Sequence, residues 1–183
     1  MSYLISGIII FFAIHIVPST QLRTVAVSNI GEKRFKAVFS IVSVTGLALI
    51  IFGLTEASVR VLWTPPIWAR SMLISIMPIV VVLWVVAETP NNIRRFIRHP
   101  MLIAMLIWGL GHLVANGDLA TTIVFASFAS FSLANIVVVN ARAPFQQPEP
   151  VSWLWDLSTV GMGLILYGII FYFHGSFTGM PLR

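Results

Sequence analysis

The sequence of 183 residues contains no cysteine. Disulfide bonds, iron–sulfur clusters, thiolate-bound metals and cysteine nucleophiles are therefore excluded. Charge is scarce as well, because the 11 basic and 6 acidic residues make up only 9% of the chain, whereas a soluble domain carries roughly 25%. What the chain does contain is apolar surface: 58% of its residues are hydrophobic and the mean hydropathy is +0.95. This composition excludes a soluble globule and predicts a polytopic membrane protein.

Long apolar runs define the expected architecture. A helix needs about 20 apolar residues to cross a bilayer core of ~30 Å. Pro18 ends the first run, Pro100 opens the fourth, and Pro78 predicts a kink in the third. We therefore expect an all-α polytopic membrane protein with one domain over 1–183 and about six transmembrane helices. The runs are 3–17, 37–54, 67–87, 101–115, 119–139 and 153–173.

Basic residues are distributed unevenly between the loops. Eight lie in the first, third and fifth loops, and three lie on the other side or at the carboxyl end. The positive-inside rule then places the odd loops in the cytoplasm and both termini on the periplasmic side. The net charge is +5, and the basic side chains responsible for it lie in loops where they face lipid headgroups. We therefore expect no nucleic-acid partner. The eight are Arg23, Lys33, Arg34, Lys36, Arg94, Arg95, Arg98 and Arg142, and the three are Arg60, Arg70 and Arg183.

Two histidines lie inside apolar runs, where an ionisable side chain is a candidate functional site. His15 follows Phe11 by four residues, and His112 follows Trp108 by the same spacing, which places each ring beside an aromatic side chain on one helix face. Neutral imidazole is a common metal ligand, and haem iron takes axial histidines. His15 and His112 are therefore candidate metal ligands on a surface suited to a flat apolar cofactor. The alternative is that each is a buried histidine bonded to a carbonyl group of a neighbouring helix.

A third histidine, His99, cannot join His112 at one metal ion. The two are 13 positions apart, which is ~20 Å along one helix, and their side chains point about 140° apart. A ligand pair must come from two helices, and His15 with His112 is the best such pair. Asn116 follows His112 by four residues and is expected to orient its ring.

Two further residues near the ends of the runs have simpler predicted roles. Asp118 directly precedes the fifth run and is expected to cap that helix. His174 lies at the end of the sixth run, where we expect water to satisfy it.

Several of these motifs together resemble the NnrU family. They are His15 near the end of the first run, Gly31-Glu32-Lys33-Arg34, Arg98-His99-Pro100, and the stretch from Trp108 through His112 to Asn116-Gly117-Asp118. The resemblance extends over essentially the whole chain. The combination of Arg-His-Pro, a histidine 13 positions later and Asn-Gly-Asp is its most specific part.

This resemblance implies a bacterial inner-membrane protein linked to denitrification and needed for production of active nitrite and nitric oxide reductases. It also implies haem b, because the plant relatives, the 15-cis-ζ-carotene isomerases, bind haem b through membrane histidines. By position, His15 and His112 match the haem-ligating histidines, and His99 matches a further motif histidine. His99, Trp108 and Asn116 are the further residues of the expected cofactor site. A thiolate ligand considered for the plant branch has no counterpart here, since cysteine is absent.

Three functional hypotheses follow. The first is a haem-binding protein that supports assembly of nitrogen-oxide reductases, with their assembly components as partners. The second is an enzyme, a haem-dependent cis-trans isomerase of a carotenoid or another isoprenoid in the bilayer. The third is a haem-free membrane scaffold whose histidines only form hydrogen bonds.

Overall fold

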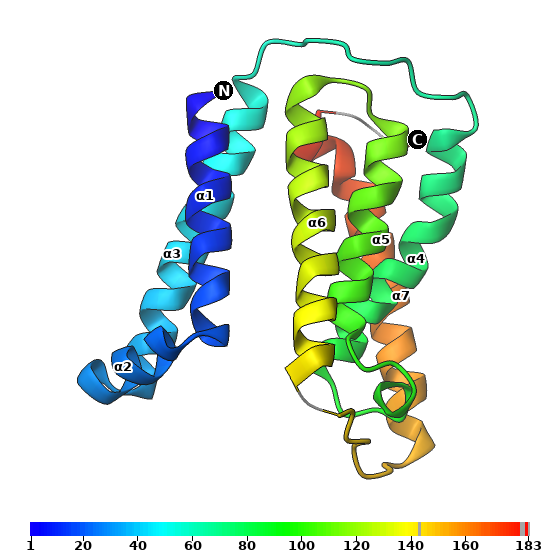
Figure 1. Cartoon of the computed structure of the whole chain (residues 1–183). Coiled ribbons are helices and arrows are strands. Elements are labelled where there is room, and N and C mark those ends of the chain that lie inside the picture. Colours follow the sequence, from blue (N-terminus) through cyan, green and yellow to red (C-terminus); the bar gives the residue numbers. More distant parts are fainter. Residues whose placement is uncertain (143, 180–181, 183) are drawn as a thin grey trace. The chain divides into compact units, whose positions relative to one another are not determined.

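The chain folds into α-helices, as the computed structural model shows for residues 1–142, 144–179 and 182 (Figure 1). Seven α-helices and two short 3-10 helices occur in this part of the chain, and it contains no strand. The elements form two compact units. Unit 1 comprises Met1–Trp63 and Asp118–Ser127, and unit 2 comprises Thr64–Gly117 and Phe128–Arg183. The single domain over 1–183 stays a prediction.

Five helices are long and apolar enough to cross a membrane, which confirms the all-α polytopic fold. A sixth apolar helix, α5, is shorter, as expected for the fourth run. α4 continues as one helix through Pro78. Several helices extend into segments expected to be loops, because a helix continues through polar residues that hydropathy does not mark. The apolar helices are α1 (Ser2–Ile16), α3 (Glu32–Thr55), α4 (Ala69–Glu88), α5 (Pro100–Ala115), α6 (Leu119–Arg142) and α7 (Trp153–Thr178).

The first loop contains a helix that the hydropathy pattern missed, α2 (Gln21–Ile30). It follows the 3-10 helix η1 (Val17–Ser19), which includes Pro18. The side chain of Thr20 caps α2 by accepting from the amide of Leu22 at 3.2 Å. Gly31 ends it with a φ of +82°, a conformation that favours glycine. Caps at both ends therefore define a helix whose composition is too polar to span a membrane.

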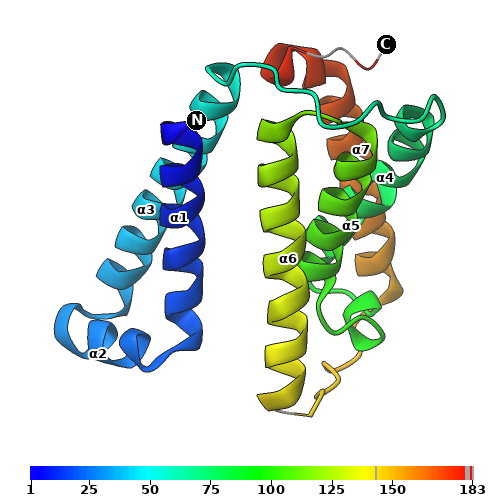
Figure 2. The same ribbon diagram turned by 45° about the horizontal axis from the view of Figure 1, so that its top comes forward.

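In unit 1, α1 packs against α3 through glycines (Figure 2). A Cβ atom at Gly46 would lie 2.9 Å from the backbone nitrogen of Phe11, and one at Gly7 would lie 2.7 Å from that of Ile50. A Cβ atom at Gly53 would meet the backbone of Leu4 even more closely. Small residues let membrane helices approach in this way, so α1 and α3 contact one another through their backbones.

In unit 2, α4 packs against both α5 and α7. Val80 and Leu83 of α4 form a buried cluster with Ala104 of α5. Gly163 of α7 allows a second close approach, because a Cβ atom there would lie 2.8 Å from the Cα atom of Val82. α4 therefore lies at the centre of this unit and supports any site formed with its two neighbours.

A polar network joins the end of α4 to the start of α7. The hydroxyl of Thr159, which is fully buried, lies 2.9 Å from that of Thr89. Asn92 lies at the start of the 3-10 helix η2 (Ile93–Arg95). Its backbone nitrogen donates to Oδ1 of Asp156 at 2.6 Å, and its side-chain Nδ2 donates to Oδ2 at 2.7 Å. Asn92 also exchanges two hydrogen bonds with the backbone of Val151. The third and fifth loops therefore meet at one end of unit 2.

Candidate functional site

His15 lies in the last turn of α1, half-buried. Its Nδ1 lies 2.6 Å from the carbonyl oxygen of Phe11, one turn earlier. The ring stacks on that of Phe11, with centroids 4.1 Å apart, and meets the edge of Phe39 of α3 at 5.1 Å. Aromatic side chains of both packed helices therefore hold the imidazole in place.

His112 has the same local geometry in unit 2. It lies in the last turn of α5, and its Nδ1 lies 2.8 Å from the carbonyl oxygen of Trp108, again one turn earlier. The indole of Trp108 lies beside the imidazole, with ring centroids 5.0 Å apart. Trp108 in turn meets the edge of Phe128 of α6 at 5.5 Å. The two histidines thus share a helix position, a backbone partner and an aromatic neighbour.

This shared hydrogen bond fixes where the proton lies on each ring. A carbonyl oxygen only accepts, so Nδ1 carries the proton of the neutral imidazole and the basic lone pair lies on Nε2. A histidine that binds a metal through one ring nitrogen normally donates the other N–H to a carbonyl or carboxylate group. His15 and His112 therefore have the donor arrangement of metal-binding histidines. They belong to different units, so a shared ligand stays a prediction.

A small pocket of about 90 Å³ lies beside His112, lined by residues of α4, α5 and α7. Its walls are mostly apolar, with Leu73, Met77 and Val81 among them, and His174 lies in the same wall. Arg70 of α4 and Tyr167 of α7 also line the pocket. With His112 of α5, its polar groups therefore come from three helices.

The position of His174 in this pocket was missed by sequence reasoning, which placed it at the interface. Thr178 donates its hydroxyl proton to the carbonyl of His174 at 2.8 Å, and Oγ1 lies 3.1 Å from Nδ1 of the ring. The hydroxyl proton is already donated, so Nδ1 is the donor and the lone pair lies on Nε2. His174 is therefore a third imidazole with its lone pair on Nε2, and only packing of α7 against α4 reveals its place in the pocket.

The turn after α5 positions Asn116 differently from the prediction. Asn116 donates from Nδ2 to the backbone carbonyl of His112 at 2.8 Å, so it binds the backbone of His112 and not its ring. The ring is oriented by the carbonyl of Trp108. Asp118 accepts from the amide of Thr121 at 3.0 Å, which confirms it as the cap of α6.

His99 lies at the opposite end of α5 from His112, at the cap position before Pro100. Its Nε2 lies 3.0 Å from Oδ1 of Asn140, and it lines a separate hollow. The structure therefore brings His112 together with Trp108 and His174 and leaves His99 apart. Among the residues that the structure describes, no three His, Cys, Asp or Glu side chains form a metal cluster.

One comparison with known proteins gave a match. The family described as "NnrU protein" matches residues 3–182, nearly the whole chain. No curated protein and no solved structure matches it.

Proposed function

The chain belongs to the NnrU family, and from this premise we propose that it binds haem b through His15 and His112. We further propose that it acts in the bacterial inner membrane, with both termini periplasmic, and supports production of nitrite and nitric oxide reductases. The single observation that supports haem binding is the shared geometry of the two imidazoles. Each donates Nδ1–H to the carbonyl four residues earlier and keeps its lone pair on Nε2.

The residues present would fit haem better than a metal site built from protein ligands alone. Haem supplies four ligands itself and needs one or two from the protein, whereas a structural zinc site needs four protein ligands. Phe11 and Trp108 lie against the imidazoles and supply the aromatic surroundings that a macrocycle requires. Bound haem would supply a one-electron redox centre, and the part of the two histidines is to hold and orient it.

The pocket beside His112 limits where a porphyrin can lie. Its volume of about 90 Å³ is well below the ≈ 300–1,000 Å³ of typical small-molecule sites. The macrocycle therefore lies outside this pocket in our proposal. His174 is the competing second ligand, because it lines the pocket with His112.

The optical spectrum of the purified protein tests this proposal. We expect haem bands in the wild-type protein, a changed spectrum in His15→Ala and in His112→Ala, and no specific haem in the double variant. Added imidazole should restore the bands of each single variant, because it replaces the missing ligand without repairing the protein chain. A colourless wild-type protein, purified after growth with a haem precursor, would favour the scaffold hypothesis.

Matched histidine variants identify the second ligand. His99→Ala removes an imidazole at the other end of α5 and should leave the spectrum unchanged. If His174→Ala abolishes the bands and His15→Ala does not, the assignment of His15 is wrong and both ligands belong to unit 2.

The role in denitrification has its own test. A strain that lacks the gene should contain smaller amounts of active nitrite reductase and active nitric oxide reductase. The wild-type gene should restore both activities, whereas the double histidine variant, present at equal amounts in the membrane, should not. Full restoration by that variant would separate the physiological role from haem binding.

The second candidate function is isomerisation of a polyene or another isoprenoid. The observation in its favour is the lining of the pocket, which is mostly apolar and includes His112, as contact with a hydrocarbon chain would require. Expression in a strain that accumulates a cis-carotene precursor distinguishes the two candidates, because only the isomerase converts the precursor.

A further inference from the structure

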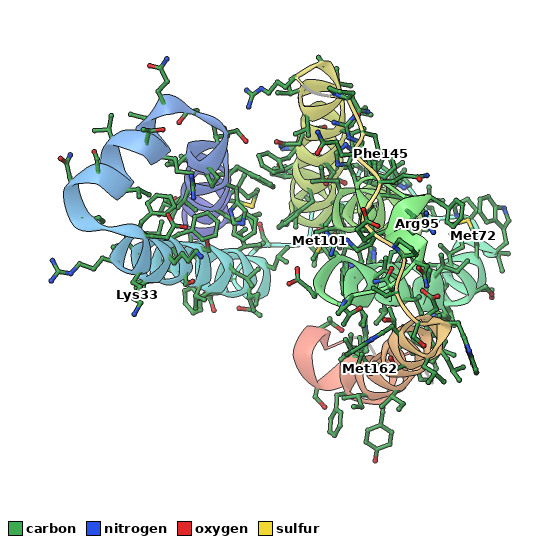
Figure 3. All side chains as sticks on the ribbon, turned by 90° about the horizontal axis from the view of Figure 1, so that it is seen from below. Lys33, Met72, Arg95, Met101, Phe145 and Met162 are labelled. Carbon is green, nitrogen blue, oxygen red and sulfur yellow. The ribbon has the colours of Figure 1, made fainter. Side chains whose placement is uncertain are left out.

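A second, wider hollow lies at the end of unit 2 where the third and fifth loops meet. Its volume is about 410 Å³, within the ≈ 300–1,000 Å³ of small-molecule sites. One wall carries Arg94, Arg98 and His99, and the facing wall is the segment that includes Pro144, Phe145 and Gln146. Figure 3 looks at this end of the molecule and labels Arg95 and Phe145. The proposed haem site does not use these residues.

The basic wall is held in position by contacts with neighbouring elements. Arg98 donates from one guanidinium nitrogen to the carbonyl of Val139 at 3.2 Å, and its guanidinium carbon lies 5.9 Å from the ring centroid of Phe145. His99 contacts Asn140 of α6, as described above. These contacts orient both side chains before any ligand arrives, which lowers the entropic cost of binding.

The opposite wall is fixed as well. Gln147 donates from its side-chain amide to the backbone carbonyl of Arg95 at 3.1 Å. The paired hydrogen bonds between Asn92 and Val151 hold the end of the same segment. Hydrogen bonds therefore hold both walls of this hollow of unit 2 in place.

The charge of the hollow favours an anion. No carboxylate is among the described residues that line it. In the described part of the chain, the two ion pairs within 4.0 Å both involve Glu32 of unit 1. Next to the hollow, Nε of Arg95 is buried and has no hydrogen-bond partner among the described residues. The amino end of α5, which starts at Pro100, adds its partial positive charge.

From this geometry we propose that the hollow binds a phosphate group. Guanidinium groups match the geometry of phosphate oxygens and bind them through two parallel hydrogen bonds. Arg94 is the most accessible partner, since it is exposed and its bond to Oδ1 of Asn91 comes from its backbone amide. The phosphate belongs either to an anionic lipid headgroup or to a soluble phosphorylated molecule, and both present the same chemistry to the arginines.

Two probes separate these sources, each applied to the full-length protein in a neutral detergent. Calorimetric titration with inorganic pyrophosphate tests a soluble ligand. Native mass spectrometry with phosphatidylglycerol, compared with phosphatidylcholine, tests a lipid headgroup. Saturable binding of pyrophosphate indicates a soluble source, and retention of phosphatidylglycerol alone indicates a lipid. Either result supports the proposal, and binding of neither probe overturns it.

Variants of equal charge change identify the hollow as the site. Arg94→Gln should weaken binding roughly tenfold, the loss expected for one charge-assisted hydrogen bond. Arg94→Lys keeps the positive charge but not the two parallel N–H donors of the guanidinium group, and its affinity should fall less than that of Arg94→Gln. The control is Arg34→Gln, which removes an exposed arginine from α3 of unit 1 and should change binding by less than about twofold. The proposal is wrong if Arg94→Gln binds like the wild type, or if Arg34→Gln loses as much as Arg94→Gln.

Discussion

His112 donates a hydrogen bond from Nδ1 to the carbonyl oxygen of Trp108, 2.8 Å away. Because the carbonyl belongs to the backbone of the same helix, the ring orientation is set by α5 itself and not by a distant side chain. Substitution of the Trp108 side chain therefore leaves this bond intact. The same is true of His15 and Phe11, so both candidate ligands are oriented locally, within single helices.

The tautomers of the histidines are the first prediction. Nitrogen-15 NMR of protein prepared without haem should show Nδ1 protonated and Nε2 unprotonated in His15 and His112. His99 should show the reverse, because its Nε2 lies 3.0 Å from the amide oxygen of Asn140, which only accepts. Single histidine variants assign the signals. A proton on Nε2 of neutral His112 would contradict the hydrogen bond to Trp108.

The second prediction concerns the close packing of α1 and α3. Gly53→Ala should destabilise the protein by about 1–3 kcal/mol, since the added methyl group meets the backbone of Leu4, which cannot rotate away. Unfolding in detergent measures this change. Gly168→Ala is the matched control, because nothing lies within 4 Å of a Cβ atom there, and it should be neutral or slightly stabilising. Equal effects of both changes would argue against the packing of α1 on α3.

The third prediction concerns the carboxylate that joins η2 to α7. Asp156→Ala removes the acceptor of two hydrogen bonds from Asn92. The backbone amides of residues 92–95 should then exchange hydrogen faster, which mass spectrometry measures. Glu149→Ala, in the exposed loop before α7, is the control and should leave exchange in that segment unchanged. If the amides of Asp156→Ala remain protected, the network does not depend on this carboxylate.

The fourth prediction concerns Trp84 of α4, which lines the pocket beside His112. Its Nε1 is buried and has no hydrogen-bond partner among the described residues. Trp84→Phe removes this costly donor and keeps most of the ring, so the free energy of unfolding should fall by less than about 1 kcal/mol. Trp84→Ala should cost about 3–5 kcal/mol, because it leaves a cavity. Equal losses in the two variants would show that the indole N–H is satisfied in the folded protein.

Hydropathy alone predicted most of the fold, because a bilayer requires each crossing segment to be apolar and helical. The six runs match α1 and α3 to α7, and Asp118 was recognised as a cap by its position. Helix α2 was missed because no apolar run marks it. Its signal was present in Thr20 and Gly31, which cap its two ends.

The candidate site was predicted only in its local part. The spacing of four residues placed Trp108 beside His112 correctly, because both lie on α5. That His174 lines the pocket beside His112 was not predicted, since this depends on how α7 packs on α4, and a periodic pattern carries no information on such contacts. The bonds of Asn92 to Asp156, 64 positions later, were missed for the same reason.

Helix α5 has 16 residues and is about 24 Å long, whereas the hydrocarbon layer measures ~30 Å. If this helix crosses the bilayer, its ends lie a few ångströms below the headgroups unless the membrane thins around it. Each ångström of such mismatch costs a fraction of a kcal/mol. Lipids with short acyl chains should therefore stabilise unit 2, and thick membranes should draw water and headgroups inward toward His99 and Asn116.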